Sequence, residues 1–200
     1  MVTAFLLEAI SKIRLSIRLL IMLTPESSLL LIVDVQQKLA HAMYAKDALF
    51  NGIANAIKGA QVLGINILVT EQNPNGLGLT IPEISNLITA IKPISKFSFS
   101  CCDNMEFMGE LNALKPENVF IAGIEAHICV YQTARDLIKL GYDVQIISDA
   151  VSSRTVENKQ IGLQKSKDVG TGITSVETVL FELLKDAQKE EFKEILDIVK

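Results

Sequence analysis

The sequence predicts an α/β protein of three layers, in which helices cover both faces of a doubly wound, mostly parallel sheet of about six strands. Short unbroken apolar runs recur along the chain, as is typical of strands that are buried on both faces. Helical patterns lie between these runs, and this alternation indicates right-handed crossovers between parallel strands. The chain has 200 residues, of which 49% are hydrophobic, enough for one core covered on two sides.

The apolar runs and helical patterns give an expected order of elements. The predicted strands cover residues 29–33, 65–69, 91–95, 119–122 and 144–147. The predicted helices cover residues 48–63, 103–114, 126–140, 176–184 and 192–199. Pro93 makes its strand an edge or irregular one, because proline cannot donate to the ladder. Gly64 and Gly141 are expected to end their helices, and Asp103 is expected to cap the second one.

The first residues differ from the rest, so we divide the chain into an amphipathic extension, 1–22, and a single α/β domain, 23–200. The extension has apolar residues at helical spacing but carries too many charges to span a membrane. It also lacks the order of features of a secretory signal. An Arg-containing presequence is one interpretation. The preferred interpretation is that Met22 is an alternative start and that the core does not need residues 1–21.

Charge and cysteine content restrict the function. The net charge is −4 and the basic residues are scattered, which argues against a nucleic-acid partner. The three cysteines form no C-x-x-C pattern, and Cys101 and Cys102 are adjacent. Free thiols are typical of a reducing compartment, so we expect a cytoplasmic protein.

Polar or chemically useful side chains follow four of the predicted strands. Asp34 follows the first strand, Lys96 the third, and Cys129 lies in the turn after the fourth. Glu71 and Gln72 follow the second strand. The carboxyl ends of parallel strands meet at one edge of a sheet, where ligands bind. A carboxylate, an ammonium and a thiol can therefore converge there.

This combination is suited to nucleophilic catalysis. A position near a helix start and a nearby ammonium would lower the pKa of the Cys129 thiol. Asp34 could take the thiol proton and later deliver it to a leaving group. Each residue alone also has a structural explanation, and for Cys129 this is a small buried hydrophobe.

Several motifs resemble the isochorismatase-like cysteine hydrolase family from about residue 24 to the end. The matching stretches are LIVDVQ at 31–36, KFS at 96–98, AGIEAHICV at 122–130, YQTARDL at 131–137 and SDAVSSR at 148–154. Each motif is weak alone, but their order and spacing are specific. TEQNP at 70–74 and GLG at 76–78 look most similar to the branch of isochorismatase-domain-containing proteins.

The resemblance implies roles for particular residues. Asp34, Lys96 and Cys129 match the catalytic triad of the family. A non-prolyl cis peptide would fall at Ile124–Glu125 and point the amides of Glu125 and Cys129 toward an oxyanion. Gln36 matches a position near the site. The implied protein is a homo-oligomer, a dimer or larger, that hydrolyses a C–N, amide-type bond of a small molecule without a cofactor.

Some family activities fit this chain poorly. The nicotinamidases of the family bind a metal through an Asp and several His residues after the second strand. Here the only histidines are His41 and His127, and the loop 71–80 has none. We therefore expect no metal site. Isochorismate is an anionic diacid, and Lys96 with Arg154 would supply few cations for it.

Other functions are also compatible with the sequence. One is vinyl-ether hydrolysis with Asp34 as acid and no covalent step, and another is a catalytically idle binding partner. A nucleotide-binding redox domain is disfavoured, because no glycine-rich loop follows the first strand. Glu125 could select an amide or cationic group of the substrate, or could point to solvent.

Overall fold

The protein folds around one sheet of six parallel strands, in the order β3-β2-β1-β4-β5-β6. The computed structural model describes residues 23–200. The strands are β1 Ser28–Val33, β2 Asn66–Gln72, β3 Ile94–Lys96, β4 Asn118–Ile124, β5 Asp143–Ser152 and β6 Gly172–Thr174. The sheet runs outward in both directions from β1 and β4, which confirms the predicted doubly wound topology.

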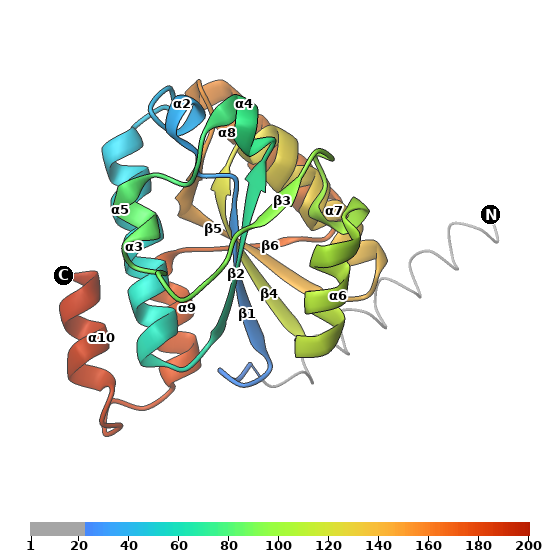
Figure 1. Cartoon of the computed structure of the whole chain (residues 1–200). Coiled ribbons are helices and arrows are strands. Elements are labelled where there is room, and N and C mark those ends of the chain that lie inside the picture. The colour runs from blue at the N-terminus through green and yellow to red at the C-terminus, as the bar shows by residue number, and fades with distance from the viewer. Residues whose placement is uncertain (1–22) are drawn as a thin grey trace.

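Helices cover both faces of the sheet, so the fold has the predicted three layers (Figure 1). On one side lie α3 Lys46–Val62, α5 Pro82–Ser85, α9 Val176–Leu184 and α10 Phe192–Val199. On the other side lie α6 Met105–Leu114, α7 Tyr131–Lys139 and α8 Val156–Asp168. The one-turn helices α2 Gln37–Ala40 and α4 Pro74–Leu77 lie at the top of the view in Figure 1, above the carboxyl ends of the strands.

The central strand β1 shows why an unbroken apolar run was the correct signal. Leu30 and Ile32 pack into the core on the side of α3. Leu29, Leu31 and Val33 pack into the core on the side of α6 and α7. Every residue of β1 is buried, because alternate side chains of a strand enter opposite layers and both layers are covered.

The sequence did not predict α8 or β6. Few residues of α8 are apolar, and the helix approaches the neighbouring turn through Gly162, where an added Cβ would lie 2.5 Å from the carbonyl carbon of Ala126. Close backbone packing thus replaces the apolar stripe on which helix prediction depends. The strand β6 has only three residues, too few to show a pattern.

Some predicted boundaries were correct and others were not. Gly64 and Gly141 end their helices with φ of 70° and 97°, as predicted. The cap of α6 was assigned one residue too early. Its side-chain acceptor is Asn104, whose Oδ1 accepts from the Phe107 N–H at 2.9 Å, while Asp103 lies in a preceding 3-10 turn, Cys101–Asp103.

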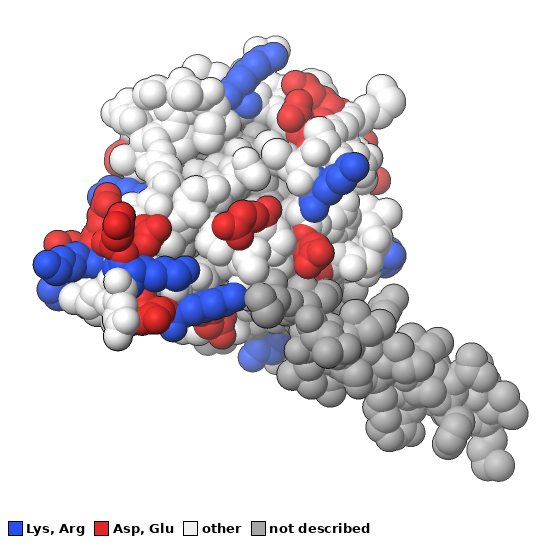
Figure 2. All heavy atoms as spheres, turned by 90° about the horizontal axis from the view of Figure 1, so that it is seen from below, with Lys and Arg blue, Asp and Glu red and all other residues white. Residues whose placement is uncertain are grey.

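The predictions about residues 1–21 and Met22 lie outside the described residues. Within residues 23–200, no helix is long and apolar enough to cross a membrane. Figure 2 shows charged side chains of both signs on the face seen from below, with no extended area of one sign.

Candidate active site

The structure brings Asp34, Lys96 and Cys129 together at the carboxyl edge of the sheet. Asp34 directly follows β1, Lys96 ends β3, and Cys129 lies in a π-helical turn, Ala126–Val130, between β4 and α7. All of them are buried, with exposed fractions of 1%, 1% and 7%. An isolated charge would be very unfavourable in this buried position, so each charged side chain must be compensated by its neighbours.

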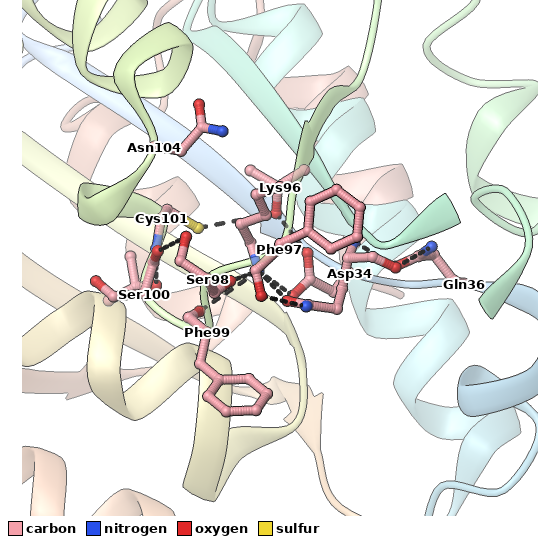
Figure 3. Close-up of polar contacts among 12 residues, drawn as sticks. Asp34, Gln36, Lys96, Phe97, Ser98, Phe99, Ser100, Cys101 and Asn104 are labelled. Carbon is pink, nitrogen blue, oxygen red and sulfur yellow. Dashed lines mark hydrogen bonds and ion pairs between the residues drawn. The ribbon is translucent and has the colours of Figure 1, made fainter. Parts of the chain in front are cut away.

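The ammonium of Lys96 is surrounded by oxygen atoms (Figure 3). Its Nζ lies 2.6 Å from Oδ2 of Asp34 and donates to Gln72 Oε1 at 3.0 Å. It also donates to the carbonyl oxygens of Ser98 at 3.1 Å and Phe99 at 3.4 Å. Burial is the largest single influence and would lower the pKa of Lys96, but the charge and hydrogen bond of Asp34, together with Cys101 and Cys129, outweigh burial and raise this pKa.

Asp34 is held by its backbone and by its side chain. Its φ of 54° lies in the left-handed region, which Asp tolerates better than most residues. The Asp34 N–H donates to the Thr70 carbonyl at 3.1 Å, and the Thr70 hydroxyl donates to Asp34 Oδ1 at 2.8 Å. Both carboxylate oxygens of Asp34 therefore have donors, one from Thr70 and one from Lys96.

The Cys129 thiol is in a different state from the one the sequence predicted. Burial raises its pKa, and the negative charge of Asp34 raises it further, while Lys96 lowers it. A hydrogen bond to Asp34 also favours the protonated thiol. The prediction of a lowered pKa was therefore wrong, because it considered the helix start and the ammonium but not burial. The resting site holds a neutral thiol beside an ion pair.

The turn between β4 and Cys129 has the backbone that the resemblance implied. The Ile124–Glu125 peptide bond is cis. The Ile124 side chain is fully buried in the core on the α3 side, so only its backbone can contribute to the site. Glu125 is 5% exposed and does not point to solvent, which removes one of its two interpretations. Its Oε2 accepts from the N–H of Arg154 at 3.1 Å and from Nε at 3.2 Å.

Gln36 connects the segments around the site. Its Nε2 donates to the carbonyls of Gln72 at 3.0 Å and Gly78 at 2.6 Å, and its Oε1 accepts from the Gln72 N–H at 2.6 Å. Gln36 is fully buried, and both the nitrogen and the oxygen of its side-chain amide are hydrogen bonded. It therefore supports the loop after β2.

Sequence reasoning placed Gln72 at this edge of the sheet but missed Thr70 and Cys101 as neighbours of the charged pair. Thr70 and Gln72 lie at the end of β2, within the TEQNP stretch. The rule that strand ends carry the site identified Gln72 and could also have found Thr70. The thiol of Cys101 donates to Thr70 Oγ1 at 3.8 Å.

Neither histidine lies in a position suited to a metal centre. The His127 Nδ1 is hydrogen bonded to Ser153 Oγ at 2.9 Å, and the His41 ring packs edge-on against Phe50. Over residues 23–200, no group of three or more His, Cys, Asp or Glu side chains could hold a metal ion.

Comparison with known proteins decides the family. The model of the isochorismatase domain matches residues 28–178. The chain belongs to the isochorismatase family. The secreted isochorismatase effector Isc1 of Phytophthora sojae is 37% identical over 182 residues, which are 89% of this chain and 87% of that protein. Isochorismatase family protein 1B of Dictyostelium discoideum is 37% identical over 193 residues, 92% of this chain and 91% of its own.

Solved structures show the same isochorismatase fold. The structure titled MAR1 ribonuclease from Caenorhabditis elegans has a TM-score of 0.84 at 30% identity and covers 90% of this chain and 92% of its own. YcaC from Pseudomonas aeruginosa has a TM-score of 0.83 at 21% identity, with 88% and 91% covered. The protein is thus an isochorismatase-family hydrolase of the α/β class.

Proposed function

We propose that this isochorismatase-family protein is a metal-independent cysteine hydrolase that cleaves an amide-type C–N bond of a small molecule. The observation that carries this proposal is the buried Lys96–Asp34 pair, with 2.6 Å between Nζ and Oδ2, beside the protonated thiol of Cys129. A buried ion pair is not needed for stability, because apolar residues of similar volume serve as well or better. A chemical role explains its presence.

The first half of the reaction forms a thioester. The Cys129 sulfur attacks the amide carbon while its proton passes to Asp34. The backbone amides of Glu125 and Cys129 hold the developing oxyanion. When the C–N bond breaks, Asp34 returns the proton to the leaving amine.

The second half regenerates the enzyme. Asp34 removes a proton from water, which attacks the thioester and releases the carboxylic acid. The proton on Asp34 then returns to the sulfur of Cys129. Lys96 keeps its positive charge throughout the reaction. It therefore stabilises the carboxylate form of Asp34, and it also stabilises any further negative charge that develops in the site.

The other side chains around the site support it. Gln36 holds the loop after β2, and Ile124 contributes its backbone to the turn. Glu125 is paired with Arg154, so the oxyanion position does not face an uncompensated carboxylate. The guanidinium side chain is 57% exposed and could contact the substrate directly.

The alternatives fit the geometry less well. In vinyl-ether hydrolysis Asp34 would begin as an acid, whereas here it forms an ion pair with Lys96, with 2.6 Å between Oδ2 and Nζ. An idle binding partner would leave the buried pair without a role. One related structure is titled a ribonuclease, but the net charge of −4 and the scattered basic residues of this chain argue against RNA.

The proposed setting is a cytoplasmic homo-oligomer with a small-molecule substrate. A structure of YcaC from Escherichia coli, 21% identical, is titled an octameric hydrolase, and its TM-score of 0.80 reflects the shared fold. The free state of all three cysteines in the structure accords with a reducing compartment.

The test is a panel of small amides and hydroxamates, assayed for release of the amine. Wild type should cleave at least one of them with chelator present, and Cys129→Ala should not. Cys102→Ala is the matched control, because Cys102 has no hydrogen bond to the ion pair, and it should retain activity. Mass spectrometry should show an acyl adduct on the peptide that contains Cys129. Equal turnover by wild type and Cys129→Ala would refute a covalent cysteine mechanism, and activity restored only by added metal would refute metal independence.

A further inference from the structure

We infer that Thr70, oriented by the thiol of Cys101, is a positioning residue that fixes the Asp34 carboxylate as the proton acceptor for Cys129. The inference rests on the proposed function, in which Asp34 carries the proton. It adds two residues that no motif assigned to the reaction.

The hydrogen bonds of Thr70 determine where its proton points. Thr70 lies in β2 opposite Val33 of β1, one residue before Asp34, and is fully buried. Its hydroxyl has one proton and accepts with its lone pairs. The Cys101 Sγ donates to Thr70 Oγ1 at 3.8 Å, and Thr70 Oγ1 donates to Asp34 Oδ1 at 2.8 Å. With the thiol on its acceptor side, the hydroxyl directs its single proton at the carboxylate.

Cys101 is suited to this task because it remains a donor. It is fully buried in the 3-10 turn before α6, and its N–H donates to Thr133 Oγ1 at 3.0 Å, which fixes the position of the turn. Burial raises the pKa of the Cys101 thiol to about 11, with Asp34 contributing in the same direction. The thiol is therefore protonated at neutral pH, and its S–H is always available to Thr70.

These contacts fix the orientation of the carboxylate. Asp34 Oδ2 is held by Lys96 and Oδ1 by Thr70, on two different strands. With the Lys96 contact alone, the carboxylate could rotate about its ion pair and turn away from the Cys129 sulfur. Figure 3 shows Cys101 and Asp34 on opposite sides of the Lys96 side chain, so the same small region contains the base, its cation and the orienting thiol.

The test measures the rate at which iodoacetamide labels Cys129, with the labelled peptide quantified by mass spectrometry so that the other thiols do not interfere. Thr70→Val removes the hydroxyl at nearly constant volume, and Thr70→Ser keeps it. Thr171→Val is the matched control. Thr171 is also buried, its hydroxyl has no hydrogen-bond partner, and it directly precedes β6, the strand at the sheet edge opposite β3.

We expect Thr70→Val to slow labelling near neutral pH by about tenfold, the effect of losing one hydrogen bond to a charged group. The difference should shrink as pH rises, because hydroxide then replaces Asp34 as the base. Thr70→Ser should remain within about twofold of wild type. Thr171→Val should match wild type at every pH. Cys101→Ala should slow labelling less than Thr70→Val does, since it frees the hydroxyl to rotate without removing it.

The possible results are distinguishable. Labelling of Thr70→Val at the wild-type rate over the whole pH range would overturn the inference and leave the proposed function intact. Faster labelling at all pH values would show that the substitution opens the fold, so that Thr70 is structural and the inference is wrong. If wild-type Cys129 fails to label near neutral pH and cleaves no amide of the panel, the proposed function itself is refuted, and the inference with it.

Discussion

The molecule contains two groups of oppositely charged side chains with similar geometry and opposite surroundings. At the carboxyl edge of the sheet, Lys96 and Asp34 lie 2.6 Å apart with side chains 0% and 1% exposed. On α7, Asp136 accepts from Arg135 Nε at 2.9 Å and from Lys139 Nζ at 3.2 Å, and the two cations are 34% and 66% exposed. Distances alone would make the two groups look equivalent.

The difference lies in what replaces a lost partner. On α7, water and ions solvate whichever charge remains, so such pairs contribute about 0–1 kcal/mol. At the sheet edge both side chains are buried, so bulk solvent does not compensate the remaining charge, and losing one partner costs about 3–5 kcal/mol. Separating the buried pair is therefore far more costly than separating the surface pair, which suits the role of base that we propose for Asp34.

The largest expected effect is that of breaking the buried pair from one side. Lys96→Met keeps an unbranched side chain of similar size and leaves Asp34 buried without a cation. We expect the free energy of unfolding to fall by about 3–5 kcal/mol, against less than about 1 kcal/mol for Lys139→Met on the surface. Urea denaturation at pH 7 measures both. Equal losses in the two variants would show that water penetrates the sheet edge and that the comparison is invalid.

A second change should recover part of that loss. Asp34→Asn in the Lys96→Met background removes the uncompensated charge while keeping the side-chain shape. The double variant should be more stable than Lys96→Met by about 1–3 kcal/mol, because replacing both partners removes the cost of leaving one buried charge unpaired. Denaturation of the four proteins in the cycle gives the coupling energy. Additive losses would mean that the two side chains do not interact in the folded protein.

The comparison also shows what could be predicted from the sequence. The doubly wound sheet could be predicted from the unbroken apolar runs in the region of β1 to β5. The polar residues that follow these runs could be predicted to lie at one edge of the sheet. Position at strand ends then identified Asp34, Lys96 and Cys129 as residues that could converge. Local features of this kind depend only on the order of residues along the chain.

The remaining features depend on contacts between distant segments. The pKa direction at Cys129 was wrong because burial depends on α6 and α7 packing over the sheet. The helix α8 was missed because its packing relies on Gly162 against the backbone of Ala126 rather than on apolar spacing. The hydrogen bond from Cys101 to Thr70 joins residues 31 positions apart, and no sequence pattern reports it.

The smallest expected effect is the pH dependence of the stability that Asp136 contributes on the surface of α7. The hydrogen bond from Arg135 lowers the pKa of Asp136 to about 2, against about 3.9 in an unfolded chain. A carboxyl with a lowered folded pKa stabilises the protein above the unfolded value, and this stabilisation disappears as pH falls through the folded value. We therefore expect wild type to exceed Asp136→Asn in free energy of unfolding by less than about 1 kcal/mol at pH 6, since the surrounding solvent screens the group.

That small advantage should decline between about pH 4 and pH 2 and should shrink in high salt at any pH. Parallel urea denaturation of the two proteins from pH 6 to pH 2 measures it, with Lys96→Met as a reference for an interaction that salt does not screen. An advantage that grows as pH falls would reverse the sign and contradict a lowered pKa for Asp136. A stability difference as large as that of the buried pair would show that α7 shields its charges from water, although the side chains of Arg135 and Lys139 are 34% and 66% exposed.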